Sequence, residues 1–239
     1  MKYFFLTLFF ISYLISFSQE KEKKSPFSGN FDLGLNITKN TESTLQFNNI
    51  FLIKYKIGSY QLSLTNNITF ISKTGEDDIL NKGEQNLRYE LIKKGLNFNV
   101  NAGQIYDISR NIKNRFTGSA GFSYSFKQKK EEKLNIGISY QIEKETTIEE
   151  LKTIQSRINS ELKLVKKLSK SVEISFISKH LPNIEKFSDF RWESNFSLRL
   201  KLSSHFLLSI NSSFNYDSFP EADIPEMDYQ LINSISYTF

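Results

Sequence analysis

The nine residues LINSISYTF, numbered 231–239, decide the fold of this chain. Successive side chains of a β-strand point to opposite faces, so a pattern of alternation shows what each face meets. One face holds Leu231, Ile235, Tyr237 and Phe239, and the other holds Ser234, Ser236, Thr238 and one apolar exception, Ile232. A soluble domain rarely stops on an exposed Phe, whereas the closing strand of an outer-membrane barrel presents aromatic rings to lipid headgroups. The tail therefore predicts a bacterial transmembrane β-barrel, with Tyr237 and Phe239 as the assembly signal that the barrel-assembly machinery reads.

The composition excludes several other classes of protein. Of the 239 residues, 14% are aromatic and 24% are charged, whereas a helical membrane protein needs long uninterrupted apolar spans. The net charge of +5 arises from 31 basic and 26 acidic residues, and because the basic residues are dispersed we expect no nucleic-acid binding. The absence of cysteine excludes thiolate metal sites, disulfides and a lipid anchor on a lipobox cysteine. We expect no cofactor, no metal site and no enzymatic activity.

The N-terminus has the pattern of an export signal. Met1 and Lys2 precede an apolar run over residues 3–17, and cleavage is expected after the small residue Ser18. A membrane anchor is the less favoured alternative, because the run is short for a span and the charged residues 20–24 follow at once. We therefore predict a signal peptide over 1–18, a short periplasmic segment over 19–27 and one transmembrane barrel over 28–239.

Segments of alternating polarity, separated by polar loops, recur from residue 28 to the end of the chain, as in membrane barrels. They predict an all-β chain that forms a single closed antiparallel transmembrane β-barrel of about twelve strands. The strands are expected at 28–38, 44–55, 59–72, 83–92, 95–106, 114–127, 133–145, 151–165, 171–181, 188–202, 205–217 and 227–239.

An even number of strands brings both termini to one end of the barrel, and that end is expected to be periplasmic. The outward aromatic residues then collect at two levels. The periplasmic level holds Tyr55, Tyr60, Tyr124, Phe126, Phe206, Tyr237 and Phe239, and the outer level holds Phe70, Tyr106, Phe116, Phe190, Trp192, Phe214, Tyr216 and Tyr229. Tight turns at 56–58, 93–94 and 203–204 fall on the periplasmic side, together with a longer turn at 128–132.

Segment 147–168 is ambiguous. Its apolar residues recur at the spacing of an amphipathic helix, which fits them better than alternation does: Ile148, Leu151, Ile154, Ile158, Leu162, Val165 and Leu168. A helix would leave eleven strands and mix the two aromatic levels. We therefore predict a strand whose polar residues face the lumen.

Three stretches resemble one known family of outer-membrane proteins. They are GLNITKNT at 34–41, NRFTGSAGFSY at 114–124 and the tail from Pro220 to Phe239. In these stretches the chain resembles the YdiY-like family of salt-induced outer-membrane proteins, although Lys39 stands where a Gly is expected. The resemblance covers the mature chain. It implies an outer-membrane β-barrel and a link to osmotic conditions, and it implies no reaction or ligand.

Charged residues of both signs occupy the inward register and are the candidate lumen lining: Arg88, Glu90, Glu143, Arg157, Glu161, Lys163, Glu173, Lys179, Arg191, Glu193, Arg199 and Lys201. Rings of charge can filter ions or small solutes, so one interpretation is a narrow passive channel. The alternative is a closed structural or interaction barrel, because a twelve-strand wall has a backbone radius of roughly 12 Å and long side chains fill much of it. In this closed barrel, Lys163 is expected opposite Glu173.

Two further patterns concern the outside of the barrel. His180 is in the outward register and Ser188 could face it, as a surface lipid hydrolase requires, but no Asp or Asn stands ready to orient the ring. Acidic residues at 76–78, 149–150 and 221–228 could gather divalent cations that bridge lipopolysaccharide, although their spacing fits no defined calcium loop. The expected partners are outer-membrane lipid and lipopolysaccharide, with ions or small solutes as cargo.

Overall fold

The computed structural model describes residues 25–39, 43–73, 79–127 and 132–239. Its twelve strands are β1 (Phe27–Lys39), β2 (Ser43–Ile57), β3 (Tyr60–Lys73), β4 (Leu80–Lys93), β5 (Leu96–Asp107), β6 (Ile112–Lys127), β7 (Glu132–Thr147), β8 (Lys152–Lys167), β9 (Val172–Pro182), β10 (Phe190–Lys201), β11 (Phe206–Asp217) and β12 (Met227–Thr238). A single turn of 3-10 helix, η2 (Ile108–Arg110), joins β5 to β6. No helix in this part of the chain is both long and apolar enough to cross a membrane. The expected signal peptide, residues 19–24 and the acidic run 76–78 lie outside the described residues.

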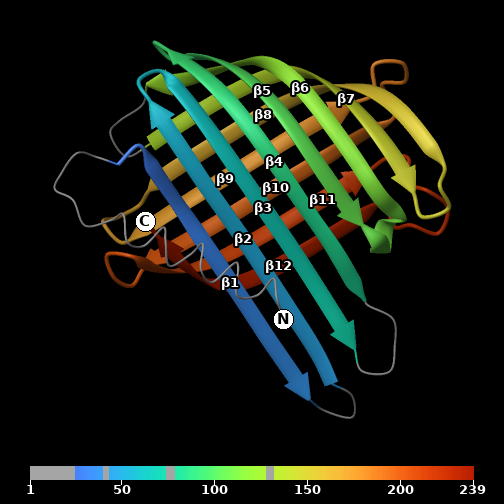
Figure 1. Cartoon of the computed structure of the whole chain (residues 1–239), viewed down its shortest axis with the longest axis horizontal. Coiled ribbons are helices and arrows are strands. Elements are labelled where there is room, and N and C mark those ends of the chain that lie inside the picture. The colour runs from blue at the N-terminus through green and yellow to red at the C-terminus, as the bar shows by residue number, and fades with distance from the viewer. Residues whose placement is uncertain (1–24, 40–42, 74–78, 128–131) are drawn as a thin grey trace, which may run out of the picture.

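The sheet closes on itself. Each strand pairs antiparallel with its neighbours in sequence, and β1 pairs with β12, which completes the barrel (Figure 1). The seam joins Asn30–Leu33 to Ile235–Thr238, and two backbone hydrogen bonds of 3.0 and 3.2 Å between Gly29 and Phe239 extend it. The predicted fold class and strand number are therefore confirmed, and residues 231–238 lie in β12, the strand that closes the barrel.

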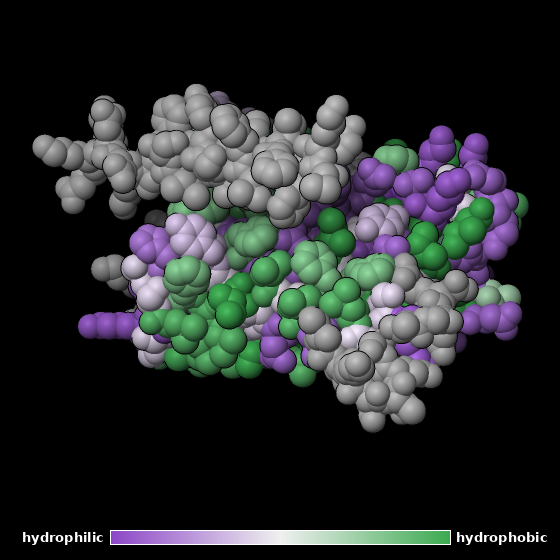
Figure 2. Space-filling model, turned by 60° about the horizontal axis from the view of Figure 1, so that its bottom comes forward, coloured by the Kyte–Doolittle hydropathy of each residue, from purple (hydrophilic) through white to green (hydrophobic). Residues whose placement is uncertain are grey.

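The barrel buries polar side chains and exposes apolar ones, which reverses the usual arrangement of a soluble domain. Along β5, Asn97 and Asn99 are each 5% exposed, whereas Phe98 and Val100 are 36% and 41% exposed. Figure 2 shows apolar side chains gathered on the wall of the barrel. A closed sheet satisfies its own backbone hydrogen bonds, so such a wall can face lipid without leaving an open strand edge.

The ambiguous segment forms a strand. β8 pairs with β7 along its length and with β9 along its second half, and these ladders satisfy its backbone groups. Ile154 lies on the outer wall with 72% exposure, whereas Arg157 is 3% exposed on the inner face. Pairing with neighbouring strands therefore outweighs the helical spacing of the apolar residues, as the strand count predicted.

Outward aromatic rings lie together near both ends of the barrel. At the end that carries Phe27 and Phe239, the ring centroids of Tyr124 and Phe126 are 4.8 Å apart. At the opposite end, the centroids of Phe190 and Tyr216 are 5.7 Å apart. We call these the terminal end and the loop end. The assignment of the terminal end to the periplasm stays a prediction.

Candidate functional site in the barrel lumen

Strand pleating alone brings the predicted charged residues onto the inner face. The register places Gln141 opposite Arg157 and Glu161 opposite Lys179, and Lys179 in turn lies opposite Glu193. Residues that pair across neighbouring strands point to the same face of the sheet. The register therefore places the other members of the candidate lining on this inward face as well. Their role in a channel stays a prediction, but their positions can be described in detail.

Arg157 is the centre of a buried cluster toward the loop end, which we call the Arg157 cluster: Glu143, Arg157, Asp189 and Arg191. Arg157 Nε donates to Glu143 Oε1 at 2.9 Å, and its Nη2 donates to Asp189 Oδ1, also at 2.9 Å. Arg191 donates to the same oxygen of Glu143. The side chains of Arg157 and Glu143 are only 4% and 3% exposed. Two guanidinium groups therefore share one carboxylate inside the barrel, which fixes three strands, β7, β8 and β10, relative to one another.

The same arginine holds the loop between β9 and β10 against the inner wall. Arg157 Nη1 donates to the carbonyl oxygen of Asp189 in this loop at 3.3 Å and to that of Leu181, near the end of β9, at 3.0 Å. In addition, Ile184 N of the loop donates to Ser156 O at 2.9 Å. Sequence reasoning missed Asp189, although it lies two residues before Arg191 and therefore shares its inward parity. It also missed the ion pair between Arg115 and Glu145, which the same parity places inside.

A second group of charges meets across the lumen. Arg88 of β4 lies 3.0 Å from Glu90 on its own strand and 3.7 Å from Glu161 on β8, which is not a neighbouring strand. Beside them, Lys179 Nζ donates to Glu193 Oε2 at 3.0 Å. We call the Arg88–Glu161 contact the cross-lumen pair. Because these side chains meet although three strands, β5, β6 and β7, separate β4 from β8, the pair narrows the lumen.

At the loop end, the turn between β5 and β6 reaches over the mouth. Arg110 lies 3.1 Å from Asp228 and 3.9 Å from Asp217, two carboxylates that belong to β12 and β11. Asn111, which has a left-handed φ of 60°, donates to Glu149 Oε2 at 2.7 Å and also to Glu221. The hydrogen bond from Asn111 lowers the pKa of Glu149. We call the contacts of Arg110 with Asp228 and Asp217 the Arg110 bridge. Alternation along strands does not place a turn residue, so this bridge was not predicted.

One predicted contact is wrong. Lys163 was expected opposite Glu173, but Lys163 pairs with Ile177, and Glu173 pairs with Lys167 and lies 4.0 Å from Arg199. The tight turn between β8 and β9 sets this register, since Leu168 N donates to Val172 O at 2.9 Å. A hairpin turn fixes which residues face each other, and its length was not evident from the pattern of alternation.

Many inward polar atoms have no partner in the described part of the chain. Twelve buried side-chain atoms lack a hydrogen bond there, and all belong to inward residues: Asn48, Asn67, Arg88, Asn97, Asn135, Asn159, Arg191, Ser197, Arg199, Asn211, Gln230 and Ser234. Buried polar groups in folded proteins are normally satisfied by protein or by ordered water. The inner face is therefore polar, and part of its hydrogen-bonding capacity is not used by the described residues.

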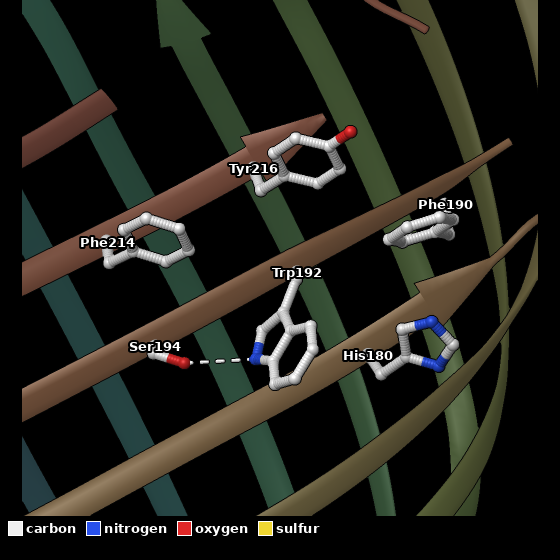
Figure 3. A pocket seen from close by; sticks show the side chains of 6 residues that line it. All are labelled: His180, Phe190, Trp192, Ser194, Phe214 and Tyr216. Carbon is white, nitrogen blue, oxygen red and sulfur yellow. Dashed lines mark hydrogen bonds between the residues drawn. The ribbon is translucent and has the colours of Figure 1, made fainter. Parts of the chain in front are cut away.

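His180 lies on the outer wall and belongs to an aromatic depression (Figure 3) lined by His180, Phe190, Trp192, Ser194, Phe214 and Tyr216. Its ring centroid is 5.2 Å from that of Phe190, and Trp192 Nε1 donates to Ser194 Oγ at 3.1 Å. Ser188 makes no hydrogen bond to His180 among the described residues, and its carbonyl oxygen accepts from Ser218 Oγ. Within those residues, no group of three or more His, Asp or Glu side chains is placed to hold a metal ion.

Comparison with known proteins identifies both a family and a fold. The model of a family described as protein of unknown function, DUF481, matches residues 31–239. No curated protein matches the chain. The solved structure of the NanC porin is similar with a TM-score of 0.54 and 7% identity, over 89% of this chain and 99% of that chain. An outer-membrane channel from Pseudomonas putida F1 is similar with a TM-score of 0.52 and 9% identity, over 89% and 94% of the two chains. Both similarities show the fold alone.

Proposed function

This chain belongs to the DUF481 family, whose function is unknown, and from the geometry of its lumen we propose that it is a narrow outer-membrane channel for ions and small solutes. The observation that carries the proposal is the polar inner face: among the described residues the buried side chains are almost all polar or charged, as are Asn97, Asn99 and Ser123. A polar inner face is what a water-filled barrel interior has, so this lining supports a hydrated lumen. A water-lined lumen open to both sides of a membrane conducts.

The outer-membrane location is supported by the inverted wall and by the similarity of the fold to a porin and to an outer-membrane channel. Outer-membrane lipid and lipopolysaccharide are then the expected surroundings of the wall. The proposal includes no catalysis. Phospholipid hydrolysis that disappeared in a His180→Ala variant would contradict this part of it.

The constriction suits small cargo. Long charged side chains meet at the cross-lumen pair, where Arg88 and Glu161 are 3.7 Å apart and 28% and 17% exposed. A partly exposed ion pair of this kind is worth about 0–1 kcal/mol, so thermal motion opens it often enough for small ions to pass. Rings of charge of both signs are also the usual means by which membrane pores select what crosses them.

A second candidate is a closed barrel with a structural or interaction role. The cross-lumen pair and the Arg110 bridge favour it, because they link opposite walls at two separate levels. The Arg157 cluster adds a third level of ion pairing.

Planar-bilayer recording of the purified protein distinguishes these two functions. A channel gives discrete unit conductance, and Arg88→Gln should raise that conductance because it removes the cross-lumen pair. Lys113→Gln is the matched control, since it removes an exposed ion pair, between Lys113 and Glu150, that lies outside the lumen, and it should leave the conductance unchanged. Silence from the native protein and from Arg88→Gln would favour the closed barrel.

A further inference from the structure

We propose that the half of the lumen nearest the terminal end binds small oxyanions and makes the channel anion-selective, an inference that rests on the proposed channel function. The site, which we call the basic vestibule, consists of Lys54, Lys133, Lys163 and Arg199. Its ligand class is a small carboxylate or phosphate.

The vestibule residues come from four strands and converge in space. Lys54 (β2), Lys133 (β7), Lys163 (β8) and Arg199 (β10) each lie within a few residues of a turn at the terminal end. All are in the inward register, where Lys54 pairs with Ser63 and Lys163 pairs with Asn135. The charges of Lys163, Arg199, Glu90 and Lys133 all act on Lys54, although β2 lies on the opposite side of the closed sheet from β8. Four cations therefore lie on the inner face at this end, together with the carboxylates of Glu90 and Glu173.

The carboxylates of this half are already engaged. Asp32 accepts a hydrogen bond from Asn30 at 3.0 Å, and Glu90 accepts one from Gln61 at 2.8 Å in addition to its ion pair with Arg88. Glu173 lies beside Arg199 at 4.0 Å. Within the described residues, no carboxylate oxygen comes within ion-pair distance of Lys54 or Lys163. These two ammonium groups are therefore available to a ligand.

Arg199 adds a guanidinium group to the vestibule, and it also lies 4.0 Å from Glu173. The N–H donors of a guanidinium group are held in a planar fork that matches the oxygens of carboxylate and phosphate. Ammonium groups add positive charge on flexible side chains and can approach the anion from several directions. One guanidinium fork together with three ammonium groups suits an anion with two or three oxygens.

The cations at the loop end of the barrel differ from those of the basic vestibule. There, Arg110, Arg115, Arg157 and Arg191 each lie beside a carboxylate of the barrel. Like charges that converge without counter-charges repel one another, and a bound anion removes that repulsion. At the terminal end, Arg199 also lies beside a carboxylate, that of Glu173, whereas Lys54 and Lys163 have none within ion-pair distance in the described residues and are left for a partner from solution.

Selectivity is measured by reversal potential in planar bilayers across a potassium chloride gradient. The native channel should prefer chloride to potassium. A Lys54→Gln/Lys163→Gln double variant should reduce the chloride-to-potassium permeability ratio by about twofold or more, since charges lining a pore set its ion preference. Lys170→Gln removes a charge from the β8–β9 turn at the same end and should leave the ratio unchanged.

Binding is measured separately, because it needs no conductance. Inorganic phosphate added to the detergent-solubilised protein should broaden the phosphorus resonance of the free anion, and the double variant should abolish the broadening. Equal migration of native and variant proteins on unboiled gels confirms that both are folded. A channel that conducts without anion preference and binds no phosphate would overturn this inference and leave the channel intact. Phosphate binding without conductance would overturn the channel and retain the anion site.

Discussion

Arg157→Ala should destabilise the barrel more than removal of any exposed ion pair. Arg157 donates to Glu143, Gln155, Asp189 and the carbonyl of Leu181, at distances of 2.6–3.0 Å. Removing one partner of a buried ion pair costs about 3–5 kcal/mol, because the remaining charges stay buried without compensation. Water in the lumen can solvate part of Glu143, so we expect the lower end, about 3 kcal/mol.

The chain carries its own probe for this experiment. Trp192 is the single tryptophan, and it follows Arg191 of the Arg157 cluster directly in β10. Urea unfolding in lipid vesicles, followed by the fluorescence of Trp192, gives the free energy of unfolding. Arg157→Lys keeps the charge but loses the fork of donors, so its loss should be intermediate. Lys113→Ala breaks a pair whose side chains are 48% and 60% exposed, and it should cost no more than about 1 kcal/mol.

An Arg157→Ala variant with the same free energy of unfolding as the native protein, while Lys113→Ala behaves as expected, would contradict a stabilising role for the Arg157 cluster. That result would mean that water already replaces the guanidinium group without loss. The lumen would then be wider, and the cluster a consequence of the fold rather than one of its supports.

Two other variants test separate parts of the structure. Arg110→Ala should raise the unit conductance, because it removes the side chain that reaches over the mouth of the barrel. It should cost less than about 1 kcal/mol of stability, since Arg110 and Asp228 are 16% and 33% exposed. An unchanged conductance in bilayers would show that the Arg110 bridge does not restrict the mouth. Gly121→Ala should destabilise the barrel by about 1–3 kcal/mol, since an added Cβ would overlap Ile138 and Ser139. Gly118→Ala is the control and should be neutral, because a Cβ added there meets no atom within 4 Å. Equal urea midpoints for the two variants would contradict the packing of β6 against β7.

Alternation along the strands was enough to predict the architecture. Asn97, Asn99 and Asn101 on β5 showed which face is polar, and an even strand count then required β8 to be a strand despite its helical spacing. The same parity placed the charged candidates inside. These features follow from a period of two, which is a local property of sequence.

The contacts between distant strands were beyond such reasoning. The Arg88–Glu161 and Arg110–Asp228 pairs depend on the shape of the closed lumen and on a turn, and neither is encoded in the order of neighbouring residues. The expected Lys163–Glu173 pair was wrong for a related reason. The length of the β8–β9 turn sets which residues lie opposite each other, and it places Ile177 opposite Lys163 and Lys167 opposite Glu173. Parity is predictable from sequence, whereas the partner across a ladder or a lumen requires the turns.

The most direct test of the central claim is the accessibility of two adjacent positions on opposite faces of β5. The chain has no cysteine, so Asn101→Cys and Val100→Cys each introduce a single thiol, one toward the lumen and one on the outer wall. In lipid vesicles, a small water-soluble thiol reagent should modify Asn101→Cys and leave Val100→Cys protected until detergent and urea unfold the protein. Modification of Val100→Cys with protection of Asn101→Cys would contradict a barrel with a water-lined interior and a lipid-facing wall.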